Sequence, residues 1–366
     1  MNIRDASQRA WLPCAEGPAL AVLLQLVPPG SGGVHDFAEL LQMRWRENGL
    51  HSELQALDPR AAPLVHLQRR PGRLALLLHY SGYGFQKRGL PLALLRQIKK
   101  LRQEWGQDLR LVSYFHESFA AGAPWRSAFW LQGLQSRIGR QVAQLSDAVC
   151  TNTSEHAAWL APACAGHAAP VRVRPVFAAI GEPGPSLQGE DAPARQPVAV
   201  VFGAAATRAR ALQACARYAP VLHQHGIQSL VEVGPGASAA GPAGAGLPLR
   251  FLGRLDTPAL HALLQRCHAG LIDYPASLLA KSSVFAALAA HGVPVLNTRP
   301  FDHDADALRA GQHYLNLPTA ASEQSHSLRE PATRLAVTQA AQSWYQPHGS
   351  WQQAAEFARL LQAQHR

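Results

Sequence analysis

Short apolar runs alternate with longer stretches of helical periodicity through the first half of this 366-residue chain. The runs that predict strands lie at about 20–27, 74–79, 110–115 and 147–151. Between these runs, apolar residues recur at helical spacing over 34–48, 90–105 and 127–146. Strands that alternate with helices are typical of a parallel sheet, so we predict an α/β fold for this half.

The alternation stops and then restarts in the second half. Residues 178–197, AAIGEPGPSLQGEDAPARQP, are rich in proline, glycine and charge and have no apolar period, which predicts a linker. Strand-like runs follow at 198–203, 228–234, 249–253, 268–274 and 293–297. The pattern therefore predicts two doubly wound sheets in tandem. The final stretch has the apolar spacing of an amphipathic helix, at Trp351, Ala354, Phe357, Leu360 and Leu361.

Composition fits two ordinary cores in a reducing compartment. The chain is 47% apolar, which is enough for two domains at this length. The apolar stretch at 19–30 is too short to span a bilayer, and Asp5 and Glu16 before it are atypical of a secretory signal. We expect a cytoplasmic protein. The cysteines are far apart and form no C-x-x-C pair, which indicates neither a disulfide framework nor a zinc site: Cys14, Cys150, Cys164, Cys215 and Cys267.

The net charge of +10 arises from 34 basic residues against 24 acidic ones. This balance favours an anionic partner such as nucleic acid, anionic lipid or a phosphorylated substrate. An arginine-rich genome would also explain the charge, so charge alone does not identify the partner. No nucleic-acid-binding motif or lysine-rich tail occurs, and we expect no nucleic-acid partner.

Polar and glycine-rich loops follow several predicted strands of the first half. Ligands of open parallel sheets bind beyond the carboxyl ends of the strands. The glycines of PPGSGGVHDF, residues 28–37, let the backbone approach a ligand closely. The loops HYSGYGFQKRG and FHESFAAGAPW follow the next strands. Together they bring candidate side chains to one sheet edge: His35, Asp36, Lys87, Arg88, His116 and Glu117.

Plainer interpretations of these residues remain open. GSGG does not match the spaced dinucleotide fingerprint, and the lysine-terminated phosphate loop is absent. His116 and Glu117 could form a pair that only holds a loop, and Lys87 and Arg88 could be a solvated tip. The gathering of all of them at one sheet edge favours a site.

The order of several motifs resembles bacterial glycosyltransferases of the GT-B fold, most closely the large family-four group. These motifs extend over nearly the whole chain: GSGGVHDFAELL, HYSGYGFQKRG, FHESFAAGAPWRSAFW, LQSRIGRQVAQLSDAVCTNT, PVFAAIGEP and HGVPVLN. The resemblance implies two Rossmann-like domains that face each other across a cleft, with the acceptor bound mainly by the first and a nucleotide-sugar donor mainly by the second. We expect a first domain over 1–177, a linker over 178–197, a second domain over 198–346, and a C-terminal helix over 347–366 that packs back on the first domain.

The resemblance also implies where the donor binds. The leaving nucleoside diphosphate carries new negative charge, so fixed cations or helix N-termini must face it. In the family pattern, the first strand of the second domain ends in glycine-arginine, and a lysine follows about seven positions after the glycine. Here FGAAATRARAL keeps Gly203, replaces the arginine by Ala204, and has Arg210 at the lysine position. We expect Gly203 and Arg210 in the donor site, with Arg208 compensating for Ala204; a solvated helix face is the alternative.

Retaining members of the family carry two glutamates that this chain lacks. Aligned on the GVPV motif that begins at Gly292, the two positions are Leu279 and Ala287. The stereochemistry of transfer therefore stays open between retention and inversion.

Instead of the glutamate pair, this chain offers the segment KSS. Lys281, Ser282 and Ser283 lie at a predicted helix start, and their amides, hydroxyls and one ammonium could bind a diphosphate. Lys281 lies in an otherwise uncharged stretch, where a cation is costly without an anionic partner. We predict that all three residues bind the donor.

Catalysis by inversion needs a base beside the acceptor hydroxyl, and the candidates are His116, Glu117 and Asp36, with His35 a weaker one. The resemblance implies that His116 lies against the donor sugar, which leaves Glu117 or Asp36 as the base. The acceptor is expected to contact the glycine-rich loops, at Gly32, Gly33, His35, Tyr83, Lys87 and Arg88.

Two further segments bear on partners. The helix over 90–105 has apolar residues interleaved with four cations; it either lies on an anionic membrane surface or packs on the core with a charged outer face. FDHDAD, residues 301–306, clusters carboxylates but lacks calcium-loop spacing, and a helix cap explains it. We expect no metal and no cofactor.

The sequence therefore predicts a cytoplasmic or membrane-peripheral glycosyltransferase of the hexosyl type. It would transfer a sugar from a nucleotide-diphosphate sugar to a glycan or lipid-linked acceptor in surface-polysaccharide assembly. A non-catalytic nucleotide-sugar or glycan-binding protein on the same fold is the alternative.

Overall fold

The computed structural model divides into two compact units. The first contains Met1–Pro175 and Ser350–Arg366, and the second contains Val176–Gly349. The structure describes residues 20–58, 71–118, 127–167, 169–184, 195–236, 246–320 and 327–363. Of the predicted linker at 178–197, residues 185–194 lie outside these ranges.

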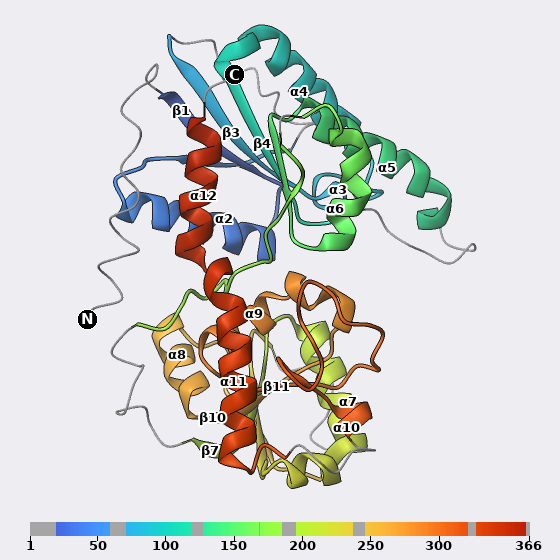
Figure 1. Ribbon diagram of the computed structural model, residues 1–366, viewed down its shortest axis with the longest axis vertical. Helices are drawn as coiled ribbons and strands as arrows, with labels where there is room; N and C mark the ends of the chain where they lie inside the picture. Colours follow the sequence, from blue (N-terminus) through green and yellow to red (C-terminus); the bar gives the residue numbers. More distant parts are fainter. Residues whose placement is uncertain are drawn as a thin grey trace. The chain divides into compact units, whose positions relative to one another are not determined.

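A parallel six-stranded sheet in the order β2-β1-β3-β4-β5-β6 forms the centre of the first unit (Figure 1). Its strands are β1 (Leu20–Val27), β2 (Glu53–Ala56), β3 (Arg73–Tyr80), β4 (Leu109–Phe115), β5 (Ala148–Thr151) and β6 (Arg172–Val173). Its helices are α2 (Gly33–Glu47), α3 (Gly82–Phe85), α4 (Leu92–Trp105), α5 (Ser127–Leu145), α6 (Ser154–Leu160) and α12 (Ser350–Gln362).

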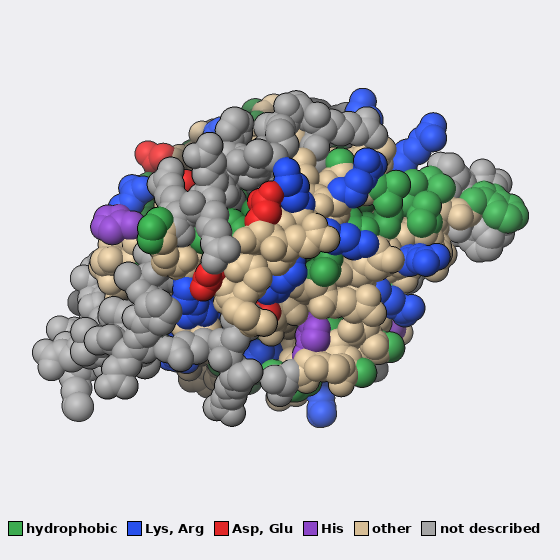
Figure 2. All heavy atoms as spheres, turned by 90° about the horizontal axis from the view of Figure 1, so that it is seen from above, with side chains coloured by type: hydrophobic (Ala, Val, Ile, Leu, Met, Phe, Trp, Pro, Cys, Tyr) green, Lys and Arg blue, Asp and Glu red, His purple; other side chains and the backbone are tan. Residues whose placement is uncertain are grey.

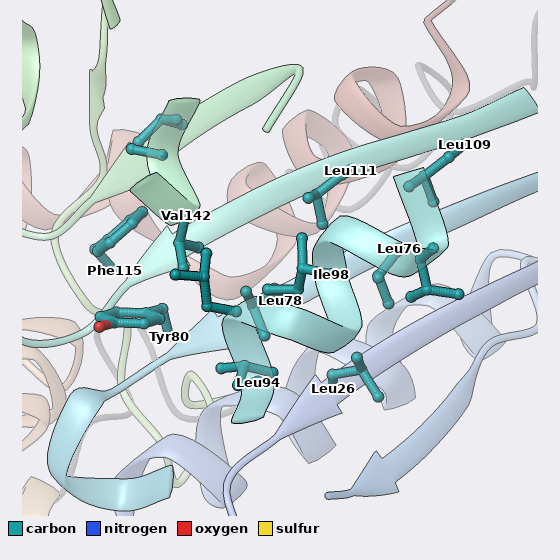
Figure 3. Close-up of a cluster of buried hydrophobic side chains, with 14 of the residues drawn as sticks. Leu26, Leu76, Leu78, Tyr80, Leu94, Ile98, Leu109, Leu111, Phe115 and Val142 are labelled. Carbon is teal, nitrogen blue, oxygen red and sulfur yellow. The ribbon is translucent and has the colours of Figure 1, made fainter. Parts of the chain in front are cut away.

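Helices cover both faces of this sheet, which explains why β3 is buried at every position. On one face, Leu76 and Leu78 of β3 pack with Leu94 and Ile98 of α4 in a cluster that also includes residues of α5 (Figure 3). Side chains at the alternate positions point to the opposite face.

The helices α2 and α12 cover that opposite face. Phe37 of α2 stacks on Tyr114 of β4, with ring centroids 5.0 Å apart, and Phe357 of α12 meets the same tyrosine edge-on at 5.5 Å. Trp45 Nε1 of α2 donates to the carbonyl of Ala354 in α12 at 2.8 Å. The C-terminal helix is therefore an integral part of the first unit's core.

The second unit contains another parallel six-stranded sheet, in the order β12-β11-β10-β7-β8-β9. Its strands are β7 (Gln196–Phe202), β8 (Ser229–Val233), β9 (Leu249–Phe251), β10 (Cys267–Ile272), β11 (Val295–Asn297) and β12 (Leu315–Asn316). Its helices are α7 (Ala205–Gln224), α8 (Thr257–Arg266), α9 (Ser283–Ala290), α10 (Leu317–Ala320) and α11 (Pro331–Tyr345), and the 3₁₀ helix η6 (Ala276–Lys281) precedes α9. The predicted α/β class with two parallel sheets is confirmed.

None of the helices in the described ranges is both long and apolar enough to cross a lipid bilayer.

Candidate active site

The second unit has a topological switch point between β7 and β10. β7, the first strand of the unit, lies beside β10, the fourth. The strands β8 and β9 extend the sheet on one side of this pair, and β11 and β12 extend it on the other. Ligands of open parallel sheets bind beyond the carboxyl ends of the strands at such a point, because the diverging loops leave a crevice there. Gly203 follows β7 and Asp273 follows β10, so both lie at this edge.

Gly203 allows the start of α9 to approach the end of β7. Its φ angle is +110°, and a Cβ atom at this position would lie 3.0 Å from Cγ2 of Val284 in the first turn of α9. Any other residue would be strained here and would push α9 away. The glycine therefore brings the predicted KSS segment next to the β7 loop.

The KSS segment is the junction between η6 and α9. Lys281 ends η6 and is partly exposed. Ser282 is buried and is the N-cap of α9: its Oγ accepts a hydrogen bond from the amide of Phe285 at 3.1 Å. The predicted helix start is confirmed, while Leu279 and Ala287, the positions aligned with the family glutamates, are each only 1% exposed.

Arg210 reaches from α7 to the end of β10. Its Nε donates to Oδ1 of Asp273 at 3.2 Å, and its side chain is 46% exposed. Arg299, after β11, donates to the same oxygen from Nη1 at 3.4 Å, and Thr298 Oγ1 donates to Oδ2 at 3.3 Å. Two guanidinium groups share the Asp273 carboxylate and each uses one nitrogen for it, so both keep N–H groups that could bind an anion.

A pocket of about 660 Å³ lies beside this cluster, lined by Asp273, Pro275, Arg299, Pro300, Phe301 and Asp302. Asp302 accepts hydrogen bonds from the amide and hydroxyl of Ser277, at 3.1 and 2.6 Å. Burial opposes ionisation of Asp302, but these bonds hold the pKa of its carboxyl below the usual value. The carboxylate therefore orders the loop after β10. No motif of the sequence indicated a site role for Asp273, Arg299 or Phe301.

Arg208 has a different environment from the one expected. It is fully buried, and its Nε donates to Oε1 of Glu232 on β8 at 2.8 Å. Its Nη1 donates to the carbonyl of Gly203 at 2.6 Å, and its Nη2 donates to the carbonyls of Pro235 and Gly236. A guanidinium whose nitrogens are all occupied has little left to offer a phosphate. Arg208 joins the loops after β7 and β8 instead of compensating for the missing arginine.

In the first unit the switch point lies between β1 and β3, which are adjacent although β2 intervenes in sequence. Gly32, with φ +136°, is the N-cap of α2, and Gly33 is its first residue. Asp36 lies in the first turn of α2, and His35 beside it is partly exposed. The loop after β1 therefore brings these predicted residues to the carboxyl edge of the sheet.

His116 and Glu117 follow β4 and are both fixed. The His116 ring packs edge-on against Phe37 and Tyr114, with centroids 5.3 and 4.5 Å away, and its carbonyl accepts from Asn152 Nδ2 at 2.9 Å. Glu117 Oε2 accepts from Ser81 Oγ at 2.7 Å. Both residues therefore lie at the carboxyl edge of the sheet.

A hydrogen-bonded chain lies behind His116. His79 Nδ1 is 3.1 Å from His116 Nε2, and His79 Nε2 is 3.0 Å from Gln25 Oε1. Gln25 Nε2 in turn donates to the carbonyl of Ala38 at 3.3 Å. Burial, reinforced by the charge of His35, lowers the pKa of His79 to about 3. The available sequence signal was Gln25, a polar residue inside the apolar run LAVLLQLV.

Tyr83, Lys87 and Arg88 lie on an ordered turn after β3. Gln135 Nε2 of α5 donates both to the Tyr83 hydroxyl at 2.9 Å and to the Arg88 carbonyl at 2.8 Å. Gln86 Oε1 accepts from the amide of Arg88 at 2.7 Å. The two cationic side chains are exposed on this turn.

Cysteine and metal chemistry find no support in the part of the chain that the structure describes. Burial raises the pKa of Cys150, Cys215 and Cys267 to about 12, so these thiols are not nucleophiles at neutral pH. Among the described residues, no group of three or more His, Cys, Asp or Glu side chains is arranged to hold a metal ion.

No protein-family model matches the chain, and no curated protein matches it in sequence. Solved structures do resemble it. An α-glucosyltransferase in complex with UDP gives a TM-score of 0.54 at 11% identity, over 90% of this chain and 96% of the other. The same kind of enzyme has also been solved with UDP-glucose and DNA containing an abasic site, with a TM-score of 0.53 at 11% identity, over 90% and 95% of the two chains.

Two synthases show the same similarity. Sucrose-phosphate synthase from Thermosynechococcus elongatus gives a TM-score of 0.55 at 12% identity, over 92% of this chain and 96% of the other. A UDP-forming trehalose-phosphate synthase from Burkholderia vietnamiensis gives 0.50 at 13% identity, over 88% and 76%. At these identities the similarity concerns the fold, and the fold is that of the GT-B glycosyltransferases.

Proposed function

We propose that the protein is a glycosyltransferase that uses a nucleoside-diphosphate sugar as donor. The observation that carries this proposal is the cationic cluster at the switch point of the second unit. Arg210 and Arg299 share Asp273 beside a pocket of about 660 Å³, and Gly203 brings the N-terminus of α9 to the same edge. Guanidinium groups and free helix-terminal amides suit a diphosphate.

The chemistry of transfer assigns complementary tasks to the two units. When the anomeric C–O bond of the donor breaks, the diphosphate gains negative charge, which Arg210, Arg299 and Lys281 would stabilise. The first unit would bind the acceptor, with His116 against a sugar hydroxyl. For inversion, Glu117 is the better placed base, because Ser81 orients its carboxylate; Asp36 is the second candidate.

A nucleotide-sugar or glycan-binding protein is the second candidate function. The specific observation that favours it is that Leu279 and Ala287, aligned with the glutamates of retaining relatives, are buried and apolar. Such a protein would bind the donor without turning it over.

A panel of uridine, guanosine and thymidine diphosphate sugars tests the donor. Thermal-shift measurements report binding by ligand stabilisation, and release of free nucleoside diphosphate reports turnover. Binding with turnover supports the transferase, binding without turnover on any acceptor supports the binding protein, and no stabilisation by any donor contradicts both.

Lys281→Ala tests the predicted donor contact. Loss of one charge-assisted hydrogen bond costs about 1.5–3 kcal/mol of binding free energy, so the donor Kd should rise about tenfold or more while the melting temperature without ligand stays nearly unchanged. Arg250→Ala, an exposed cation on β9, is the matched charge control and should leave the Kd unchanged. A normal Kd for Lys281→Ala would remove Lys281 from the donor site.

The acceptor is proposed to be a glycan or a lipid-linked glycan at an anionic membrane surface. Around α4 and α5, Leu92, Trp130 and Leu134 are 43%, 76% and 43% exposed, and Lys99 and Lys100 of α4 are exposed too. Figure 2 shows hydrophobic side chains with Lys and Arg side chains around them on one face of the molecule. Apolar residues beside cations suit anionic lipid.

Vesicle sedimentation tests this surface. The protein should bind vesicles containing phosphatidylserine, bind neutral vesicles much less, and lose binding in the variant Trp130→Ala/Leu134→Ala. Leu335→Ala, which removes a leucine of the second unit that is 55% exposed, is the control. Equal binding by the double variant and the control would leave a free glycan as acceptor. Because a similar fold has been solved with DNA, a salt titration with duplex DNA belongs in the same series.

A further inference from the structure

We infer that Gln25 and His79 are positioning residues that fix the tautomer of His116, with the proton on Nε2, so that this ring can accept a hydrogen bond from a sugar hydroxyl only at Nδ1. The inference deepens the proposed function, since it assigns an atom-level role to the histidine expected at the reacting sugar. It rests on one continuous chain of hydrogen bonds in the first unit.

The direction of that chain is set by a backbone carbonyl. The Ala38 carbonyl can only accept, so Gln25 must turn its NH₂ group toward it. Gln25 then presents Oε1, also an acceptor, to His79 Nε2 at 3.0 Å, and His79 must carry its proton on Nε2. A neutral His79 has a lone pair on Nδ1, which faces His116 Nε2 at 3.1 Å. His116 must therefore donate from Nε2.

His79 has good reason to stay neutral. It is fully buried between β1 and β4, and the described groups that face it are Gln25, the Phe37 ring 5.8 Å away, and His116, none of them a carboxylate. Burial is the main reason why its pKa is low, and electrostatic repulsion between its protonated ring and His35 of α2 acts in the same direction. With a pKa of about 3, His79 is an acceptor at every pH at which the protein would work.

The hydrogen-bonded chain of Gln25, His79 and His116 also crosses the switch point of the first unit. Gln25 is on β1, His79 is on β3 and His116 follows β4, so three neighbouring strands of the sheet hold it. Gln25 and His79 are both 0% exposed, and His116 is 6% exposed. With Nε2 committed inward, a hydrogen bond between this ring and a sugar hydroxyl can form only at Nδ1. A histidine whose second nitrogen is bound in this way is held in one tautomer and one orientation.

Histidine-selective ¹⁵N labelling and long-range ¹H–¹⁵N correlation spectra read the tautomer directly, without any activity. The signals are assigned by their loss in His116→Gln and His79→Gln. In the wild-type protein at pH 7.5, we expect both rings to be protonated at Nε2. Wild-type spectra in which His116 is protonated at Nδ1, or exchanges between both tautomers, overturn the inference.

Variants connect the tautomer to the reaction. His79→Leu should release His116 into a mixture of tautomers and lower the transfer rate at saturating substrate about tenfold or more, with little change in donor Kd. His79→Gln keeps an acceptor for His116 and a donor for Gln25, and should recover the Nε2 tautomer and most of the rate. His225→Leu, the same change at a buried histidine of the second unit, should leave both unchanged.

The outcomes separate this inference from the proposed function. If the wild type transfers no sugar but shows the Nε2 tautomer, which His79→Leu then loses, the transferase proposal fails and the positioning role stands. If His79→Leu keeps the Nε2 tautomer or the full rate, the positioning role fails. Should His79→Leu not fold, Gln25→Leu and the wild-type spectra decide instead.

Discussion

Two arginines separated by a single residue on α7 have opposite environments. Arg208 is 0% exposed and pairs with Glu232, which is 2% exposed, whereas Arg210 is 46% exposed and pairs with Asp273 at the sheet edge. Breaking a buried ion pair leaves an uncompensated charge in the interior, so Arg208→Ala should lower the free energy of unfolding by about 3–5 kcal/mol. Arg210→Ala should change it by less than about 1 kcal/mol and should instead weaken donor binding.

Urea denaturation of both variants, together with donor titration, checks this division. The double variant Arg208→Met/Glu232→Leu should recover only part of the lost stability. Apolar residues of similar volume replace a buried ion pair well, but the carbonyls of Gly203, Pro235 and Gly236 lose their donor. If Arg208→Ala keeps the wild-type urea midpoint, or if it folds normally but no longer binds the donor, Arg208 would be a donor-binding residue after all.

At the scale of elements, the turn between β3 and α4 depends on one glycine. Gly89 has φ +68°, and a Cβ atom there would lie 3.0 Å from Gln135 Nε2 and 3.1 Å from Tyr83 Cε2. Gly89→Ala therefore has two costs: the strain of a positive φ at a residue with a Cβ, and the displacement of Gln135. Gln135 matters because it holds the Lys87–Arg88 turn through its hydrogen bond to the Arg88 carbonyl. We expect a loss of more than about 1 kcal/mol of unfolding free energy.

Gly49→Ala separates the two costs. Gly49 also has a positive φ, +76°, but an added Cβ would meet nothing within 4 Å. Its substitution should cost only the backbone strain, about 1 kcal/mol. Equal urea midpoints for the two variants would mean that Gln135 yields freely and does not hold the turn.

Sequence periodicity was sufficient for the long elements and insufficient for the short ones. The run predicted at 20–27 is β1, and the helix predicted at 127–146 is α5 within one residue, because buried strands and amphipathic helices of this length repeat their pattern several times. The strands β2, β6 and β12, of 4, 2 and 2 residues, are too short to show any alternation.

The candidate site was predictable where a polar residue follows a strand, as at His116 and Glu117. It was not predictable where partners come from distant segments. Nothing in the pattern indicates that Asp273 pairs with Arg210, 63 residues away, or that Arg208 is turned inward toward β8. Those contacts depend on side-chain direction around α7, which sequence spacing alone does not fix.

At the scale of the whole molecule, buried neutral histidines in both units make stability depend on pH. Burial lowers the pKa of His79 in the first unit to about 3, and burial likewise lowers those of His225 and His291 in the second unit to about 4. Each native pKa is below the unfolded value of about 6.5. The unfolded chain therefore binds protons first as the pH falls, and stability that is complete above about pH 6.5 is lost toward pH 4.

The size of this effect follows from the number of protons taken up on unfolding. Well below pH 6.5, each such histidine contributes a slope of up to about 1.4 kcal/mol per pH unit, so three together contribute roughly 4 kcal/mol per pH unit. The net charge of +10 adds repulsion as carboxylates are neutralised.

Urea unfolding between pH 7.5 and 4.5 measures this slope. His225→Gln should reduce this slope by up to about 1.4 kcal/mol per pH unit, because the variant has one fewer histidine that takes up a proton on unfolding. A free energy of unfolding that stays flat over this range would mean that these histidines are already protonated in the native state, and His79 could then not accept the Nε2 proton of His116.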